Sequence, residues 1–504
     1  NTFLFNTDVN IGYDKNLSDD VKMTLTAGFN HQYTQTDIST NTGQNLAPFI
    51  ETVSGAASTT VTATYGLDRY AVTGQFFQAT FGYKNRAFLT GAIRRDGSTI
   101  FSPDQTNQLY PKISGSYVLV EGKDGWLNGA KLRASFGDAG GLTALGTYDR
   151  FWQFSPAAYL GKSTILPGRQ LANPSVKPER MRELEFGGDF SLVKNKVSLG
   201  LTYYSQNITD LVVNRVLAAS SGGTSIVNNV GEMQNKGFEV SLGANVIKTK
   251  DFSWDANVVF SSNRNKITKL PGGNVAITNA AGAPIFLIEG QPASVFYGNP
   301  YARNADGSLL LTSQGFPQRE RGTQTGILSY TPQRNASGQP TGAFITSVIG
   351  NPNPDWTGSF SSNFLYKKLS LRFLLDAIQG VQVFNADKRT RNNVGIGDLA
   401  EAELRGTAPR GTVFALVPIE EYRVDNGSFV KLREVSLGYS FVKALAGKYD
   451  LNVSLVGRNL VSWDNYNGFD PETNAGGNSS LLRGVDFGNN PIPRTYQLTI
   501  SANF

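Results

Sequence analysis

The chain has 504 residues and a formal net charge of +6, and apolar residues make up 40% of it. This fraction is too low for a bundle of membrane-spanning helices, and no run of about 18 consecutive apolar residues occurs. Cysteine is absent and His31 is the single histidine, which excludes disulfides, thiolate metal sites and multi-histidine metal sites. No block of about five or six Lys and Arg residues occurs, so the sequence predicts no nucleic-acid binding.

Apolar and polar residues alternate along segments that recur from the beginning of the chain to its end. Successive side chains of a strand point to opposite faces, so each segment predicts a strand with one apolar and one polar face. In chain order, the clearest apolar positions are Phe3, Phe5, Val9, Ile11, Val21, Met23, Leu25, Phe29, Ala130, Leu132, Phe136, Leu184, Phe186, Phe238, Val240, Leu242, Trp254, Val258 and Phe260.

These strands are longer than usual. We expect about 10–15 residues each, which matches the length of about 9–11 residues needed to cross a bilayer at a tilt. Strands with an apolar outer face and a polar inner face are typical of outer-membrane barrels. We therefore predict an all-β fold, an antiparallel transmembrane β-barrel in the bacterial outer membrane. The residues predicted to line its lumen are Arg133, Glu183, Glu185, Asp189, Glu239, Arg372 and Arg458.

The connections between the predicted strands alternate between short and long. Outer-membrane barrels have short periplasmic turns and long extracellular loops. The long connections, which we expect on the extracellular face, lie near residues 40–68, 139–177, 265–354, 381–427 and 464–490.

The predicted strands number about 15, whereas a closed antiparallel bacterial barrel has an even number. An open barrel would leave unpaired strand edges in lipid. We therefore expect further strands outside this sequence. The opening residues, NTFLFNTDVNIGY, also lack the features of a signal peptide.

The chain closes on RTYQLTISANF, which alternates strictly. Its apolar face ends in an aromatic residue, which resembles the signal read by the barrel-assembly machinery. The residues assigned to this signal are Tyr496, Leu498, Ile500 and Phe504.

Several stretches resemble the SusC/RagA-type TonB-dependent outer-membrane transporters. Four of them match the C-terminal barrel half of that family in order and spacing, and two more match its middle. They are IGNPNPDWTGSFSSNFLYKKLSLRFLLDAIQG (349–380), SFVKLREVSLGYSF (428–441), LVGRNLVSWDNYNGFDPETN (455–474) and NNPIPRTYQLTISANF (489–504), with QNITDLVV (206–213) and NVGEMQNKGFEVSL (229–242).

The resemblance implies that residues 1–504 are the C-terminal part of a barrel of about 22 strands, with the plug and first strands not represented. It implies active import of oligosaccharides or peptides with a SusD-like surface lipoprotein. Energy would come from TonB, through a plug and TonB box outside this chain. It implies no enzyme activity, metal or cofactor, and it allows a dimer of transporter–lipoprotein units.

Two other functions fit the strand pattern. One is a passive porin or outer-membrane assembly component that uses the same barrel. The other is a soluble all-β glycan-binding protein.

Aromatic residues in the long connections are the candidate substrate contacts, because aromatic faces can stack on sugar rings or grip peptides. They could instead form an interfacial girdle or pack the loops on one another. The candidates are Trp152, Phe154, Tyr159, Tyr297, Tyr301 and Tyr466.

Carboxylates in two places could carry other chemistry. Glu183 and Glu185 could in principle hydrolyse a glycoside, but charged side chains are the ordinary lining of a water-filled lumen. The DPET sequence at residues 470–473 could bind a cation, although a loop turn explains it more simply.

Overall fold

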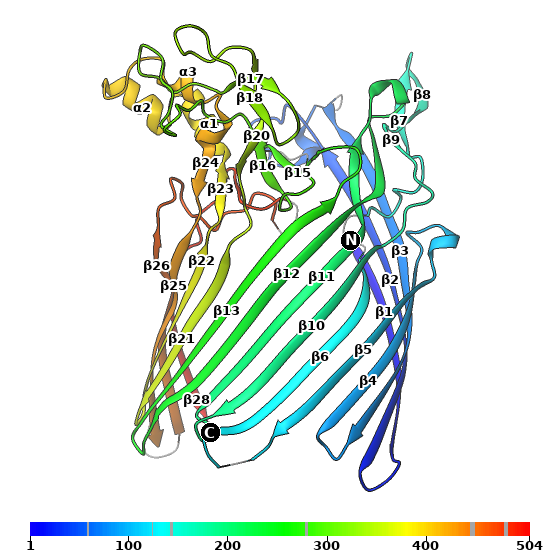
Figure 1. The fold of residues 1–504 in the computed structure, drawn as a ribbon. Helices are drawn as coiled ribbons and strands as arrows, with labels where there is room; N and C mark the ends of the chain where they lie inside the picture. The colour runs from blue at the N-terminus through cyan, green and yellow to red at the C-terminus, as the bar shows by residue number, and fades with distance from the viewer. Residues whose placement is uncertain are drawn as a thin grey trace. The chain divides into compact units, whose positions relative to one another are not determined.

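The computed structural model describes residues 1–57, 60–122, 124–141, 145–277, 281–443, 449–477 and 482–503. Among these, fifteen strands pair in succession along one antiparallel path, as predicted (Figure 1). No helix of this described part is long and apolar enough to cross a membrane. The path runs through β1 (Thr2–Asn16), β2 (Val21–Thr42), β3 (Thr62–Tyr83), β4 (Ala87–Ser98), β5 (Gln108–Val120), β6 (Leu127–Gly141), β10 (Glu179–Leu192), β11 (Val197–Val216), β12 (Ser225–Lys248), β13 (Phe252–Lys269), β21 (Trp356–Tyr366), β22 (Leu369–Gln379), β25 (Phe429–Lys443), β26 (Tyr449–Asp464) and β28 (Thr495–Asn503).

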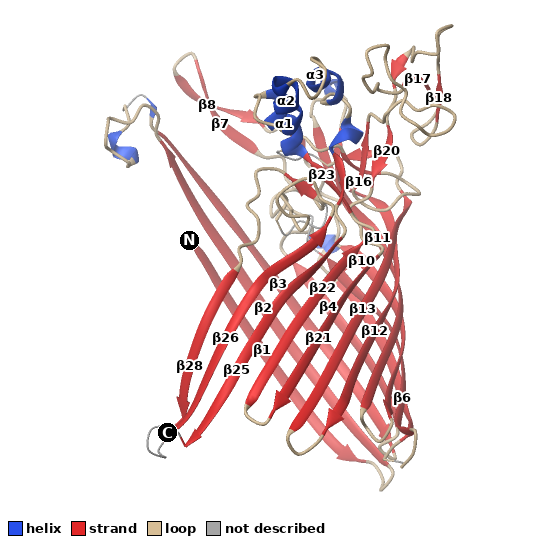
Figure 2. Cartoon of the chain, turned by 90° about the vertical axis from the view of Figure 1, so that its left-hand side faces the viewer, coloured by secondary structure: helices blue, strands red, loops and turns tan. Residues whose placement is uncertain are grey.

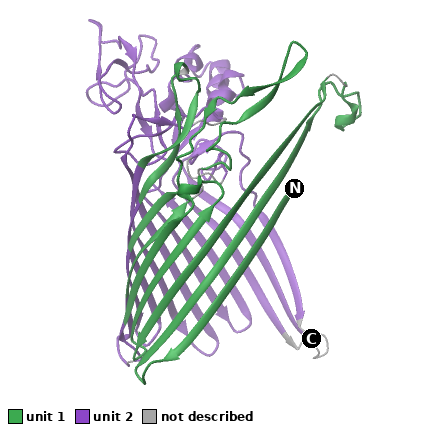
Figure 3. Ribbon diagram, turned by 90° about the vertical axis from the view of Figure 1, so that its right-hand side faces the viewer, with its two compact units in different colours: residues 1–117, 133–184, 208–231 green, residues 118–132, 185–207, 232–504 purple. Residues whose placement is uncertain are grey.

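The chain divides into two compact units, coloured separately in Figure 3. Unit 1 contains residues 1–117, 133–184 and 208–231. Unit 2 contains residues 118–132, 185–207 and 232–504.

Short turns join the strands within several hairpins. Between β3 and β4, Lys84 and Asn85 have φ of 50° and 53°, and the Arg86 amide donates to the Tyr83 carbonyl at 2.9 Å. Positive φ at both central residues defines a type I′ turn, whose twist matches that of the flanking strands. The short connection predicted here is therefore a tight hairpin.

The apolar faces of these strands stay uncovered. Phe186, Leu242 and Ile500 are 50%, 37% and 62% exposed. Soluble monomers rarely leave large contiguous apolar surfaces open. Their exposure therefore agrees with strands whose apolar side contacts lipid, and it argues against a dry protein interior on that side.

Longer segments follow β2, β6, β13, β22 and β26, and they carry the smaller elements. Their assignment to the extracellular side stays a prediction. In unit 1 the elements are β7 (Phe154–Tyr159), β8 (Lys162–Pro167) and β9 (Gln170–Leu171), with 3₁₀ turns at Val53–Gly55, Pro103–Gln105 and Ala219–Ser221.

Unit 2 carries the remaining small sheets and the three α-helices found among the described residues. Figure 2 shows the helices grouped near β23. The elements are β14 (Val275–Ala276), β15 (Ile285–Leu287), β16 (Val295–Gly298), β17 (Arg321–Gln324), β18 (Tyr330–Pro332), β19 (Ala343–Phe344), β20 (Ser347–Gly350), β23 (Gln382–Asn385), α1 (Ala386–Asn393), α2 (Asp398–Arg405), α3 (Thr412–Leu416), η5 (Glu420–Arg423), β24 (Val424–Asn426) and β27 (Val485–Asp486).

Two of the largest buried apolar side chains of unit 2 lie in these connections. Phe296 of β16 and Phe384 of β23 are fully buried, with ring centroids 5.6 Å apart. Ile285 and Val485 pack in the same cluster. We call this cluster of Phe296, Phe384, Ile285 and Val485 the loop core.

Candidate ligand-binding loops and their charged anchor

Strand β25 contains a bulge that keeps its charged residues on one face. On β22 the partners of Leu432 and Glu434 are adjacent residues, so Arg433 has no partner there, and on β26 two residues lie between their partners. A bulge inserts one unpaired residue, here Arg433, so the alternation of faces changes phase beyond it. Lys431 and Glu434 can therefore share the polar face, although simple alternation would separate them.

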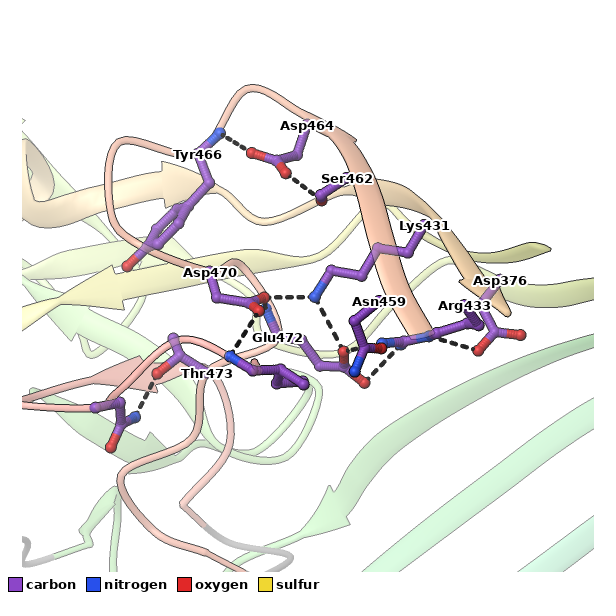
Figure 4. Close-up of polar contacts among 12 residues, drawn as sticks. Asp376, Lys431, Arg433, Asn459, Ser462, Asp464, Tyr466, Asp470, Glu472 and Thr473 are labelled. Carbon is purple, nitrogen blue, oxygen red and sulfur yellow. Dashed lines mark hydrogen bonds and ion pairs between the residues drawn. The ribbon is translucent and has the colours of Figure 1, made fainter. Parts of the chain in front are cut away.

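Lys431 and Arg433 hold the segment that follows β26 (Figure 4). Lys431 Nζ donates to Asp470 Oδ1 at 2.5 Å and to Glu472 Oε2 at 3.0 Å. Arg433 donates through Nη2 to Glu472 Oε1 and through Nε to Asp376 Oδ2, both at 2.8 Å. We call these five residues, Asp376, Lys431, Arg433, Asp470 and Glu472, the charged anchor.

The anchor is costly to break because removing one partner would leave a buried charge uncompensated. Lys431 is only 4% exposed, and removing one partner of a buried ion pair costs about 3–5 kcal/mol. Burial disfavours ionisation of Glu472, but hydrogen bonds from Arg433 and Lys431 outweigh burial and lower the pKa of this carboxyl. The anchor thus fastens the loop through ionised carboxylates.

The DPET sequence belongs to this anchor. Asp470 and Glu472 accept from Lys431, and the Glu472 amide donates to Asp470 Oδ1 at 2.9 Å in a turn. In the described ranges, no group of three or more His, Cys, Asp and Glu residues is arranged to hold a metal ion. The carboxylates of Asp470 and Glu472 accept hydrogen bonds from Lys431, and Asp470 also accepts one from the loop's own backbone.

An open cavity of about 460 Å³ adjoins the anchor. Lys431, Asp470, Phe469, Asn459 and Arg494 are among the residues that line it. The volume lies within the roughly 300–1,000 Å³ typical of ligand pockets. The anchor therefore shapes a space that a small ligand could enter.

Tyr466 supports the same loop from inside. Its ring is buried, and its hydroxyl donates to Asp486 Oδ2 at 2.6 Å. Burial and this hydrogen bond raise the pKa of Tyr466, and burial raises the pKa of Asp486. Because the ring is covered, its position does not support the predicted contact with substrate.

Two of the three aromatic candidates of unit 1 lie together, and the third lies at the other end of β7. Trp152 and Phe154 lie 6.1 Å apart, at the base of the β7–β8 hairpin, and both are about half exposed. The Trp152 indole N–H donates to the Gly168 carbonyl at 3.1 Å, which fixes the ring. Tyr159 is exposed at the end of β7. These three rings remain available for stacking.

The aromatic candidates of unit 2 near β16, Tyr297 and Tyr301, mainly pack and hydrogen-bond within the connections. Tyr297 is buried, and its hydroxyl donates to the Ile327 carbonyl at 2.7 Å. Tyr301 is half-buried, its amide donates to Glu421 Oε2 at 2.8 Å, and burial raises the pKa of its hydroxyl. Tyr297 offers no free ring face, so its position gives no support to a role in binding.

Two of the predicted lumen residues share one partner. Arg458 Nε lies 3.1 Å from Glu434 Oε2, and Arg372 Nε lies 4.0 Å from Glu434 Oε1. The others lie on β6, β10 and β12, and their place on a water-filled lumen stays a prediction. They are Arg133, Glu183, Glu185, Asp189 and Glu239.

The predicted assembly signal lies on the last strand. Tyr496, Leu498 and Ile500 are exposed on β28, which pairs with β26. Phe504 lies outside the described residues. The role of these four residues stays a prediction.

Comparison with known proteins gives the family. Residues 1–460 match the family model described as TonB dependent receptor-like, beta-barrel. The chain belongs to this family. The resemblance to SusC/RagA-type transporters, the antiparallel barrel fold and the outer-membrane location are thereby confirmed.

Two curated relatives are similar over most of this chain. TonB-dependent receptor P3 of Formosa agariphila is 28% identical over 485 residues, which cover 89% of this chain and 47% of the relative. TonB-dependent receptor SusC of Bacteroides thetaiotaomicron is 24% identical over 469 residues, covering 86% of this chain and 44% of the relative. The chain spans about half the length of the curated relatives it matches.

A solved structure shares the fold. The structure titled RagAB peptide transporter superposes with a TM-score of 0.80 at 20% identity, covering 99% of this chain and 55% of that chain. At this identity the match supports the fold alone.

Proposed function

We propose that this chain is the barrel portion of a TonB-dependent receptor that imports oligosaccharides or peptides, together with a SusD-like surface lipoprotein. The observation that carries the proposal is the family match over residues 1–460. A relative named SusC and a solved structure titled as a peptide transporter support nutrient import as the activity.

The loops suit the capture of such substrates. Half-exposed Trp152 and Phe154 and exposed Tyr159 offer ring faces near one hairpin. Stacking of this kind contributes about 0.5–1.5 kcal/mol per aromatic pair beyond buried area. The charged anchor holds a second loop beside a cavity, which favours a preformed site over a flexible one.

Uptake by whole cells tests the proposal. Cells that carry the complete protein should accumulate labelled oligosaccharides or peptides, and a protonophore should stop accumulation because TonB depends on the proton gradient. Uptake that persists with the protonophore would instead identify a passive porin. Absence of the protein from the membrane fraction would identify a soluble glycan-binding protein.

The aromatic contribution can be tested with matched variants. Phe154→Ala and Tyr159→Ala should each raise the substrate concentration for half-maximal uptake about 3- to 10-fold. Trp126→Ala is the control, because Trp126 is equally exposed but lies in the short connection before β6. An equal effect of all three variants would contradict the assignment of substrate contacts to β7–β8.

A further inference from the structure

A second open cavity, of about 430 Å³, lies among the connections of unit 2, apart from the charged anchor. Residues of α1, α3 and η5 contribute to its wall. Three arginines line it, Arg319, Arg389 and Arg423, together with Glu420 and Phe414. Its volume falls within the range of roughly 300–1,000 Å³ that is usual for ligand pockets.

Arg423 is buried without adequate pairing. It is 4% exposed, and within the described residues its Nε has no hydrogen-bond partner. The Glu420 carboxylate lies 3.6 Å from Arg423 Nη2, too far for a good hydrogen bond. The other Glu420 oxygen accepts from the Asn299 amide at 2.8 Å. The Phe384 ring, whose centroid lies 4.6 Å from the guanidinium carbon, and Glu420 compensate this buried cation only in part, so a further anion at the cavity would stabilise it.

The other two arginines add positive charge. The Arg319 guanidinium lies 3.5 Å from the centroid of the Phe344 ring, which orients it. Arg389 is exposed on α1. Burial lowers the pKa of Arg423 to about 10, although Glu420 opposes this and Arg389 adds to it, so Arg423 remains a cation at neutral pH. Three arginines face one glutamate at this cavity, so its lining is positively charged.

We propose that this cavity binds an oxyanion, a carboxylate or a sulfate ester, carried by the imported substrate. Guanidinium groups match the geometry of such oxyanions with paired hydrogen bonds. Phe414 is 85% exposed at the same wall and would contact the apolar part of that ligand. The inference rests on the proposed import function and narrows its substrates to anionic ones.

Calorimetric titration of the complete protein in detergent micelles tests the site. The probes are sulfate and glucuronate, with glucose as the neutral comparison, at constant ionic strength. We expect at least one of the two anions to bind and glucose not to bind at this cavity. Arg389→Gln and Arg319→Gln should each weaken anion binding about 10-fold, since each removes a charge-assisted hydrogen bond.

Two further variants keep the test decisive. Arg423→Lys retains the charge but not the paired geometry, so it should also weaken binding, whereas Arg423→Gln could disturb folding. Arg405→Gln is the control, because Arg405 is an exposed arginine of α2 paired with Glu401 and does not line the cavity. It should leave binding unchanged, because exposed charges at a distance are screened by salt.

The outcomes separate the site from the import function. Binding of glucuronate alone assigns a carboxylate, and binding of sulfate alone assigns a sulfate ester. If neither anion binds, or if Arg405→Gln weakens binding as much as Arg389→Gln, the proposal is overturned. Absence of anion binding to the parent protein, together with energised uptake of neutral substrates, would overturn the anion site alone. Anion binding without energised uptake would overturn the import function alone.

Discussion

The long strands and the connections of unit 2 place their large apolar side chains in opposite environments. Along the strands, residues such as Phe186 and Leu242 remain exposed. In the connections, Phe296 and Phe384 are fully buried against each other. The apolar faces of the strands are left for lipid to cover, whereas the connections bury large apolar side chains in a protein core of their own.

The difference teaches that the two regions have different sources of stability. The strands are held by the hydrogen bonds between them and by the membrane. Lipid adapts to the shape of a side chain, so one apolar residue on the outer face can replace another at little cost. The connections are held by close packing and by the charged anchor, which depend on particular side chains. Substitutions should therefore affect the two regions differently.

The largest expected effect comes from emptying the loop core. Phe296→Ala should lower the free energy of opening of the loop core by about 3–5 kcal/mol, because it removes a fully buried ring. Hydrogen exchange of residues 285–298 measures this opening. Phe186→Ala, on the exposed strand face of β10, should leave exchange in those residues unchanged. Equal exchange in both variants would contradict a separate loop core.

A charge on the apolar strand face should have the next largest effect. Leu242→Arg should cost about 2–4 kcal/mol if Leu242 faces the middle of the bilayer. The matched variant is Ser241→Arg, one residue away on the polar face of β12, and it should cost far less. Folding of the complete protein into lipid vesicles, followed by the gel mobility of unboiled samples, compares the two. A reversed order would mean that the faces are exchanged.

Acid should produce the smallest effect, confined to the anchored loop. The pKa of Glu472 is lowered below its usual 4.5, so its contribution to stability is complete above that value and is lost as pH falls through the lower folded pKa. The loop at residues 464–477 should exchange faster in acid, and Glu472→Gln should remove this part of the response.

Asp486 acts in the opposite direction in the same loop. Burial raises its pKa, so the folded loop binds its proton more readily and gains stability as pH falls. Asp486→Asn should therefore make the acid response of the loop steeper than in the parent protein. A flatter response would show that Asp486 does not oppose Glu472.

Alternation alone predicted most of the strands, because a two-faced strand in lipid needs one residue type on each side. The strand count and the exposed Phe186 and Ile500 agree with that reasoning. The bulge was not predicted, although the adjacent Arg433 and Glu434, two charges in succession within an alternating strand, are a sequence signal that could have indicated it. Whether two adjacent charges form a bulge depends on the register with the neighbouring strands, and the local sequence does not determine that register.

The candidate site was harder to predict for the same reason. Tyr297 and Tyr466 were predicted to contact substrate because they are aromatic. Aromatic residues also pack in protein cores, and both of these are buried. The partnership of Lys431 with Asp470 joins residues 39 positions apart, and the under-paired Arg423 is recognisable only from its burial. Long-range contacts of this kind are set by loop packing.

The single inserted residue, Arg433, lets β25 keep both the loop contacts of Lys431 and the apolar outer face of Val435 and Leu437. Removing it would restore plain alternation, and then either Lys431 and its loop contacts or Val435 and Leu437 would turn to the wrong side. The length of β25 is therefore constrained even where its composition is not. A deletion of Arg433 would detach the loop or turn charged side chains toward the apolar face of β25.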